Sequence, residues 1–441
     1  MSETSIQTEA TPSGTTPRKA MFIVFLVVFI DLLGFGIVLP LLPLYGKHFV
    51  EPLFEGGETS KAGGAVVGLL MAMFSLMQFL FAPVWGRISD RVGRRPILLI
   101  GLVGSVLFYS LFGYASDMWS EPAAAALALT LLFIARIGAG IAGATVSTAQ
   151  AVIADCTTPE RRSRGMALIG AAFGIGFTFG PILAAVALIS FRSYLGAVGY
   201  VAAVLSFIAF VLGWRLLPET RRFDQAPPTT RQWLNWSAAR QALRNAAIGP
   251  VILTFFLATL GFASFETTLA LFLEKVMRFE KYETYLVFAY VGLVLMLTQG
   301  FLYRKLALRL TETTFMAIGI GLMALGLVGL GIVTCTGEAL LPDAVLGLLL
   351  YGALATAVVG FAFLTPSAQA LISRRTAAHE QGEILGVNQS AAAMARILGP
   401  MIGVTLFKLM SPPVLPYVFG AVVLIVLLPL MPRIRQGSTP P

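Results

Sequence analysis

Long runs of apolar residues, separated by short polar stretches, make up most of this chain. A helix needs about 20 consecutive apolar residues to cross the hydrocarbon core of a bilayer. The sequence contains twelve such runs, and each predicts a membrane-spanning helix. Their approximate limits are 21–46, 64–85, 95–115, 123–154, 164–190, 195–217, 247–274, 283–303, 313–334, 342–372, 382–408 and 414–431. The runs at 123–154 and 342–372 are long, which predicts tilt or extension past the bilayer.

The longest polar stretch between the runs divides the chain into two parts. It covers 218–245 and contains Pro227-Pro228, so it predicts a cytoplasmic linker. A six-helix bundle at 21–217 precedes it, and a second at 246–432 follows. Within the linker, Trp and Leu are mixed with Arg over 231–244, a pattern typical of an amphipathic helix lying on a membrane surface.

Composition and charge agree with a multi-pass membrane protein. The chain is 57% hydrophobic and 12% charged, whereas soluble domains carry about 25% charged residues. Twenty-two Lys and Arg residues lie in the tails and in one set of loops, and seven lie in the other set. The positive-inside rule therefore places both tails, 1–20 and 433–441, in the cytoplasm, with 1–20 expected to be disordered. The same rule explains the net charge of +9 without nucleic acid as a partner.

An internal repeat relates the two bundles. The segment 147–153 matches 366–372 at an offset of 219 residues, and Gly180-Pro181 matches Gly399-Pro400 at the same offset. Two repeated six-helix halves with a site near the bilayer midplane are the plan of secondary transporters. The repeat predicts that matching residues form the scaffold and that unmatched residues carry the specific chemistry.

Three ionisable residues within the apolar runs are unmatched. They are Asp31, Arg136 and Glu266, which the repeat pairs with Pro250, Ala355 and Lys47 respectively. A charge at bilayer depth costs about 2.5–3.5 kcal/mol on insertion scales, so such residues are functional-site candidates by default. Two other readings stay open: Asp31 forms a structural ion pair with Arg136, and Glu266 is a partly solvated acid near a helix end.

The loop after the second run carries a dense pattern of glycine and charge. Its residues are Gly86, Asp90, Arg91, Gly93, Arg94 and Arg95. The pattern is similar to the G-x-x-x-D-R-x-G-R-[RK] signature of the major facilitator superfamily. The resemblance covers roughly 20–432, and it implies an all-α membrane protein with twelve transmembrane helices in two pseudo-symmetric halves. It also implies that the loop latches the halves together on the cytoplasmic side, through ion pairs across their interface, with Asp155 pairing with its arginines.

The fifth and fourth runs carry two further resemblances. The fifth run contains Gly170, Gly174, Gly176, Gly180 and Pro181, which looks like the motif of proton-coupled antiporters in this superfamily. Ala184-Ala185 stands where that motif usually has a glycine pair, and helix packing is the alternative role for the glycines. Arg136 and Gly140 are similar to the family's fourth-helix motif, in which a buried arginine takes part in proton transfer. The first run, from Asp31 to Pro43, resembles tetracycline/proton antiporters and tetracycline-transporter-like proteins.

Several other residues at membrane depth are candidates for a substrate cavity. They are Gln78, Phe173, Phe265, Gln299, Asn388, Gln389 and Arg396. The amides can bridge helices instead, the aromatic rings can pack in the core, and Arg396 can contact an anion, pair with Glu266 or serve packing alone. The sequence shows no Walker A loop, metal-ligand cluster or nucleophile constellation, so we expect neither an enzyme nor a cofactor.

These features together predict a proton-coupled exporter of a small lipophilic or amphipathic molecule, such as a tetracycline-like drug or a metabolite. Burial and a neighbouring arginine act in opposite directions on the proton affinity of a carboxyl group, so Asp31 or Glu266 can exchange a proton. The proton gradient supplies the energy for exchange by alternating access. We expect a monomer surrounded by lipid in a bacterial inner membrane. The alternatives are a symporter or uniporter for a sugar or other metabolite, and a membrane receptor that transports nothing.

Overall fold

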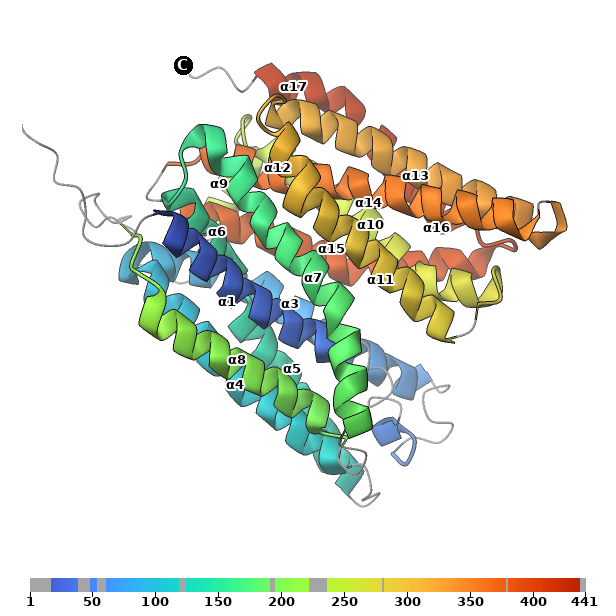
Figure 1. Ribbon diagram of the computed structural model, residues 1–441, viewed down its shortest axis with the longest axis horizontal. Coiled ribbons are helices and arrows are strands. Elements are labelled where there is room, and N and C mark those ends of the chain that lie inside the picture. The colour runs from blue at the N-terminus through green and yellow to red at the C-terminus, as the bar shows by residue number, and fades with distance from the viewer. Residues whose placement is uncertain are drawn as a thin grey trace, which may run out of the picture.

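The structure is a computed structural model that describes residues 17–38, 48–53, 61–118, 124–190, 195–221, 236–279, 281–340, 342–377 and 380–436. The described residues of the first half, here the N-half, form α1 (Pro17–Val38), α3 (Lys61–Val92), α4 (Arg94–Asp117), α5 (Ala125–Gly143), α6 (Val146–Asp155), α7 (Arg162–Ser190) and α8 (Ala197–Leu216). Figure 1 shows these helices in blue to green.

The second half, here the C-half, is also helical in its described part. It contains α10 (Gly249–Lys275), α11 (Lys281–Leu297), a π-helical turn η6 (Thr298–Leu302), α12 (Tyr303–Leu306), α13 (Glu312–Leu340), α14 (Asp343–Arg374), α15 (Gln381–Leu409), α16 (Leu415–Ile425) and α17 (Met431–Gln436). The short helix α9 (Trp236–Arg244) precedes it and packs against α10 and α15. It lies inside the segment predicted as an amphipathic helix.

In the described part of the chain, 11 helices are long and apolar enough to cross a membrane, and a shorter apolar helix covers Leu415–Leu430. This last segment coincides with the predicted twelfth span, 414–431, and its 16 residues extend about 24 Å, somewhat less than the thickness of the hydrocarbon core. Two other spans are interrupted. The predicted helix 123–154 breaks after Gly143 into α5 and α6, and the predicted helix 283–303 changes to π-helical geometry at Thr298.

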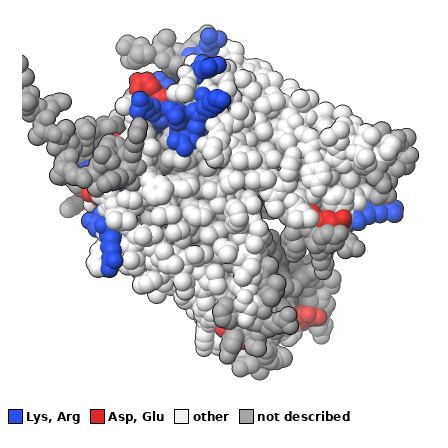
Figure 2. Space-filling view, viewed as in Figure 1, with Lys and Arg blue, Asp and Glu red and all other residues white. Residues whose placement is uncertain are grey.

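The lateral surface of the molecule is apolar. Leu107, Leu348 and Phe301 are 60%, 74% and 71% exposed, and such a surface on a soluble protein would drive association. Figure 2 shows few charged side chains on the sides of the bundle and clusters of Lys and Arg near its ends. Lipid contact explains why the helices are apolar on both their inner and outer faces.

The two halves meet along a seam that is closed at one end. We call this end the terminus end, because α1 begins there and α17 ends there (Figure 1). The seam is formed by α3 against α15 and by α7 against α11. Toward the opposite end the two halves diverge (Figure 1).

Candidate functional site

The seam closes tightly where Gly86 of α3 meets Gly382 of α15. A Cβ atom on either glycine would overlap the carbonyl group of the other. One turn deeper, a Cβ on Gly386 would lie 2.6 Å from the carbonyl oxygen of Ala82. Glycine at these positions lets the backbones of the two halves touch, and a larger residue would hold them apart.

Asp90 joins the halves through backbone groups. Its carboxylate accepts hydrogen bonds from the N–H groups of Gly382 at 3.1 Å and Glu383 at 2.9 Å. These groups belong to the first turn of α15, where helical N–H groups have no partner within the helix. A carboxylate at this position also interacts favourably with the helix dipole. Asp90 is therefore a capping residue for a helix in the other half.

Arg94 and Arg95 of the loop contact groups of their own half, whereas the prediction was ion pairs across the seam. Arg94 contacts acids of its own half, Asp90 at 2.5 Å and Asp155 at 3.2 Å. Arg95 donates to the Trp214 carbonyl oxygen at 2.5 Å, also within the N-half. The expectation of ion pairs across the seam is wrong for these two residues, because the backbone of α15 already occupies the far side of Asp90. Arg91 lies in the last turn of α3.

In the part of the chain that the structure describes, the ion pair that crosses the seam joins Arg87 to Glu383. Sequence reasoning missed this pair, although a signal was present. Arg87 follows Gly86 directly, and Glu383 is the acid in the first turn of α15. The carboxylate and guanidinium are both nearly enclosed, with 11% and 6% of the side chains exposed.

Gly93 shapes the turn between α3 and α4. Its φ of 114° lies in a region that favours glycine. The turn directs the N–H groups of Arg94 and Arg95 to the Glu219 carboxylate, at 2.9 Å and 3.1 Å. Glu219 follows the end of α8, so this contact fixes the loop to its own half.

The glycines of α7 divide between two faces. Gly170 and Gly174 face the C-half, where a Cβ on Gly174 would lie 2.7 Å from the backbone nitrogen of Met296. Gly176 and Gly180 face α1, where a Cβ on Gly180 would lie 2.5 Å from the carbonyl carbon of Gly36. The motif therefore serves close packing on both sides of α7. The side chain of Pro181 lies outside the described residues.

Gln299 occupies the room that Gly170 leaves. A Cβ on Gly170 would overlap the Gln299 side chain, which is buried. Its Nε2 donates to the Ala362 carbonyl oxygen at 3.3 Å, and its Oε1 has no hydrogen-bond partner among the described residues. Gln299 also lies in the π-helical turn η6, a geometry that often occurs at functional sites.

Arg136 is enclosed within the N-half. It is 2% exposed, and its guanidinium lies over the Phe74 ring of α3, 4.8 Å from the ring centroid. Among the described residues, Tyr109 of α4 also acts on its charge electrostatically. Its Nε and Nη1 have no hydrogen-bond partner in the described part of the chain. Asp31 lies on α1, but its side chain is outside the described residues, so the predicted pair stays a prediction.

Glu266 and Arg396 lie near each other in the C-half. Glu266 is on α10 and Arg396 on α15, and each acts electrostatically on the other. Arg396 also reaches across the seam, where its Nη2 donates to Oε1 of Gln78 at 3.1 Å. Arg396 lies about 22 Å along α15 from its start at the terminus end, close to the middle of a bilayer.

A small pocket lies at this point between the halves. It is lined by Gln78, Ala82, Gly143, Ala144, Val146, Gln389 and Arg396. The structure thus brings together Gln78, Gln389 and Arg396 from the predicted cavity. Phe265 instead lies in the core, where it is 1% exposed and packs edge-on against Phe262 at 5.6 Å. The Phe173 side chain lies outside the described residues.

Two buried amides have no hydrogen bonds within the described part of the chain. Asn388 of α15 and Gln150 of α6 are fully buried, and neither the nitrogen nor the oxygen of either amide has a partner. Asn388 was among the predicted cavity residues, whereas Gln150 was assigned to the scaffold because it matches Gln369 in the repeat. Buried polar groups without partners are rare and mark sites where a water or ligand can bind.

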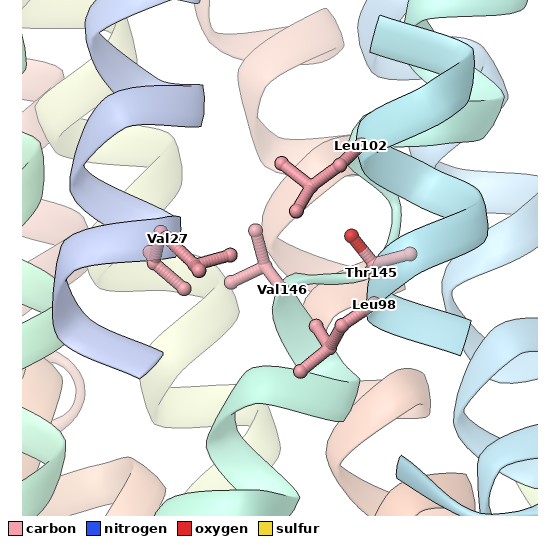
Figure 3. A pocket seen from close by; sticks show the side chains of 6 residues that line it. Val27, Leu98, Leu102, Thr145 and Val146 are labelled. Atoms are coloured by element: carbon pink, nitrogen blue, oxygen red, sulfur yellow. The ribbon is translucent and has the colours of Figure 1, made fainter. Parts of the chain in front are cut away.

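A second pocket lies within the N-half and is mainly apolar. Figure 3 shows side chains of Val27, Leu98, Leu102, Thr145 and Val146 around it, from α1, α4 and the start of α6. Its lining carries no charged side chain. It therefore offers a binding surface for an apolar group but no group to exchange a proton. Among the described residues, no group of three or more His, Cys, Asp or Glu could hold a metal ion.

Comparisons with known proteins agree on one family. A family model described as Major Facilitator Superfamily matches residues 24–359. Tetracycline resistance protein, class E, of Escherichia coli is 29% identical over 394 residues, which cover 89% of this chain and 88% of that protein. Major facilitator superfamily domain-containing protein 10 of Bos taurus is 30% identical over 433 residues, which cover 89% of this chain and 88% of that protein. The crystal structure of the human organic anion transporter MFSD10 (TETRAN) has a TM-score of 0.76 at 25% identity, and the match covers 95% of this chain and 100% of that chain.

Proposed function

This chain belongs to the Major Facilitator Superfamily, and we propose that it exports a small lipophilic or amphipathic molecule in exchange for protons. It is an integral, multi-pass membrane protein of a transporter family. The proposed cargo is a tetracycline-like drug or a metabolite, and the proposed mechanism is alternating access driven by the proton gradient. The chain itself needs no cofactor in this mechanism.

The observation that carries the proposal is the position of the charges relative to the seam. The seam is closed from Gly86–Gly382 at the terminus end to Gln78–Arg396 at mid-depth. Arg396 therefore lies at the inner limit of this closed part, with Glu266 acting on it electrostatically. Toward the opposite end the two halves diverge (Figure 1). A site at mid-depth that is closed on one side is what alternating access requires.

The orientation follows from the distribution of basic residues. The loops at the terminus end carry most of the Lys and Arg, so we place this end in the cytoplasm of a bacterial inner membrane. In that orientation the structure is the outward-facing state, with the loop around Asp90 as its cytoplasmic latch. Loss of the Asp90 cap and of the Arg87–Glu383 pair would accompany the change to the inward-facing state.

The proposed proton path uses the mid-depth acids. A proton enters from the outside and binds Asp31 or Glu266. Protonation of Glu266 removes its electrostatic attraction for Arg396. The hydrogen bond to Gln78 of the other half then becomes the main interaction that holds the Arg396 side chain in place. Because substrate and proton favour different states of this site, one is released when the other binds, which is the linkage that exchange requires. Arg136 provides a fixed positive charge near Asp31 in this scheme.

Arg396 also favours a second candidate, transport of an organic anion. It is a guanidinium in a pocket between the halves, with Gln78 and Gln389 beside it. Guanidinium groups bind carboxylates through two parallel hydrogen bonds. One relative by structure is described as an organic anion transporter, and several relatives by sequence are described as tetracycline resistance proteins.

Transport by purified protein tests both candidates. Proteoliposomes that contain a pH-sensitive dye would be placed in a proton gradient, with tetracycline in one series and an amphipathic carboxylate in another. The proposal expects a dye response that requires both the protein and one of these molecules. Proton movement with tetracycline supports drug export, and proton movement with the carboxylate alone supports the second candidate.

The remaining alternatives have distinct results. A uniporter would move substrate without any proton flux, and a receptor would move nothing. A symporter would move protons and substrate in the same direction. Any of these three results would contradict proton-coupled export.

A further inference from the structure

Two arginines from opposite halves lie side by side at the terminus end of the seam. Arg164 lies on the first turn of α7 in the N-half, and Arg304 lies on α12 in the C-half. Their neighbours Ser163 and Tyr303 hydrogen-bond through their hydroxyl groups, and Tyr303 also packs against Ala167 of α7. Figure 2 shows Lys and Arg side chains gathered over the start of α7 and α12. We call Arg164 and Arg304 the seam arginines.

The seam arginines carry charge that no acid among the described residues pairs with. They repel each other electrostatically. The Nε atom of each is buried without a hydrogen-bond partner, and among the described residues neither side chain forms an ion pair. Lys305, which is exposed, follows Arg304 and adds to the positive charge.

Other arginines close to the seam differ because acids compensate them. Arg374 contacts Glu312 at 2.9 Å. The exposed acid Glu160 interacts with Arg374 and with Arg162. Repulsion across the seam is therefore concentrated at the seam arginines, where closing the terminus end brings two like charges together. An anion bound between them would attract both guanidinium groups, and this attraction would hold the two halves together.

The surface beside the seam arginines indicates the kind of anion. Phe301 and Leu302, on the turn directly before α12, are 71% and 43% exposed, and Leu308 beyond it is 68% exposed. The basic pair thus lies at the polar edge of an apolar surface that faces lipid. A soluble phosphate has no apolar part that could contact this surface, whereas the acyl chains of a phospholipid can pack against it.

We propose that the seam arginines bind the phosphate group of an anionic phospholipid, and that this lipid stabilises the closed terminus end. Basic pockets between membrane helices are sites of this type for lipid headgroups. The lipid would link α7 to α12 with its headgroup while its chains cover Phe301. The proposal depends on the fold and not on the transported substrate, so it stands or fails independently of the proposed function.

Amide hydrogen exchange at the start of α15 measures the closure of the terminus end. The N–H groups of Gly382 and Glu383 are protected by Asp90 only while the seam is closed. In nanodiscs, replacing part of the phosphatidylcholine by phosphatidylglycerol is expected to slow this exchange about fivefold for each seam arginine. The variant Arg164→Gln/Arg304→Gln is expected to lose this response. In phosphatidylcholine alone it should exchange more slowly than the wild type, because the repulsion is gone.

Three controls keep the proposal falsifiable. Arg309→Gln removes an exposed charge at the same end and should keep the full lipid response. Native mass spectrometry provides a second readout, in which the wild type should retain one more phosphatidylglycerol than the double variant. Soluble glycerol phosphate, added to phosphatidylcholine nanodiscs, should have no effect. A wild type that ignores phosphatidylglycerol, a double variant that responds like the wild type, or an equal effect of glycerol phosphate would each overturn the proposal.

Discussion

Asp90 at the terminus end and Arg136 at mid-depth are both almost fully buried charges, with 1% and 2% of their surface exposed. Asp90 accepts hydrogen bonds from two backbone N–H groups of the other half and pairs with Arg94. Arg136 has a phenyl ring over its guanidinium and two donor nitrogens without a described partner. A buried charge without partners costs several kcal/mol. The hydrogen bonds at the terminus end thus stabilise one arrangement of the two halves. At mid-depth, donor nitrogens remain available to bind a ligand or to interact with a group that takes up a proton.

The two intramembrane arginines extend this comparison. Among the described residues, Phe74 and Tyr109 are the groups that act on Arg136, and both belong to its own half, so they move with it as one body. Arg396 bonds to Gln78 across the seam, so its contacts change when the halves separate. We infer that Arg136 supplies a constant field and that Arg396 responds to the conformational state.

The largest expected effect is that of Arg136→Gln. We expect transport to fall about tenfold or more, because a charge-assisted interaction contributes about 1.5–3 kcal/mol. We also expect thermal stability to be unchanged or higher, because an uncompensated buried charge is removed. Transport in proteoliposomes and a thermal unfolding curve measure the two effects.

The alternative is a structural ion pair between Arg136 and Asp31, and it makes the opposite prediction. Removing one partner would leave a buried charge and destabilise the protein by about 3 kcal/mol or more. The variant Arg136→Gln/Asp31→Asn would then recover stability. Loss of stability in the single variant with recovery in the double variant would therefore establish the structural pair, and wild-type transport in Arg136→Gln would refute the functional role given to Arg136.

A second prediction concerns the glycine contact at the terminus end. Gly86→Ala places a methyl group against the carbonyl group of Gly382, so the closed seam cannot form without backbone movement. Gly68→Ala is a matched control on the same helix, because nothing lies within 4 Å of its Cβ position. We expect Gly86→Ala to open the terminus end and Gly68→Ala to leave it closed.

The thiol of Cys156 reports this opening. Burial raises its pKa to about 12, and the neighbouring Asp155 adds to the effect. The thiolate is the reactive form, so maleimide reacts slowly at pH 8 while the pKa stays raised. Opening admits water and lowers the pKa, so we expect Gly86→Ala in a Cys335→Ser background to react about tenfold faster. Equal rates for Gly86→Ala and Gly68→Ala would show that the glycine contact does not control the seam.

A smaller effect is expected for the ion pair across the seam. Removing the charge of Arg87 or Glu383 should favour opening of the terminus end. The double variant should lose less free energy of closure than the sum of the two single variants. For a pair that is this enclosed, we expect a coupling energy of about 1–3 kcal/mol. Hydrogen exchange at Gly382 in Arg87→Gln, Glu383→Gln and the combined variant measures it. A coupling energy near zero would assign the closing force to Asp90 alone.

The smallest effect is expected at Gln78. In Gln78→Ala, Arg396 loses the acceptor from the other half, and water can replace it in the polar pocket. We therefore expect about a threefold change in the apparent affinity for substrate and little change in stability. Substrate titration of the purified variant checks this. A loss as large as that of Arg136→Gln would mean that Gln78 is essential, and that the two arginines do not differ as described.

The fold was largely predictable because lipid imposes a simple pattern on sequence. Eleven of the twelve predicted runs coincide with long apolar helices, and the seam falls at Gly86, which the loop pattern identified. The break after Gly143 and the π-helical turn at Thr298 were not predicted, since the mean hydropathy of each span stays high despite the Thr and Ser residues after Gly143 and the Thr298-Gln299 pair. Hydropathy detects the length of a span and not a local change of its hydrogen bonding.

The site was predictable by residue type but not by partner. Depth alone identified Arg136, Glu266 and Arg396, because a charge in an apolar run is conspicuous. The capping of α15 by Asp90 was not predictable, because its partners are backbone N–H groups nearly 300 residues away. Gln150 shows that a residue that repeats in both halves can still lack hydrogen bonds to the described residues in one of them, so the repeat alone does not predict its partners.

The central claim is that a proton binds at a mid-depth acid and drives transport. The direct test compares two activities in proteoliposomes: substrate exchange without a gradient, and substrate accumulation driven by a proton gradient. We expect Glu266→Gln or Asp31→Asn to keep exchange and to lose gradient-driven accumulation, since the empty and loaded carriers still interconvert but no proton is carried. If both variants retain full gradient-driven accumulation, the claim is contradicted.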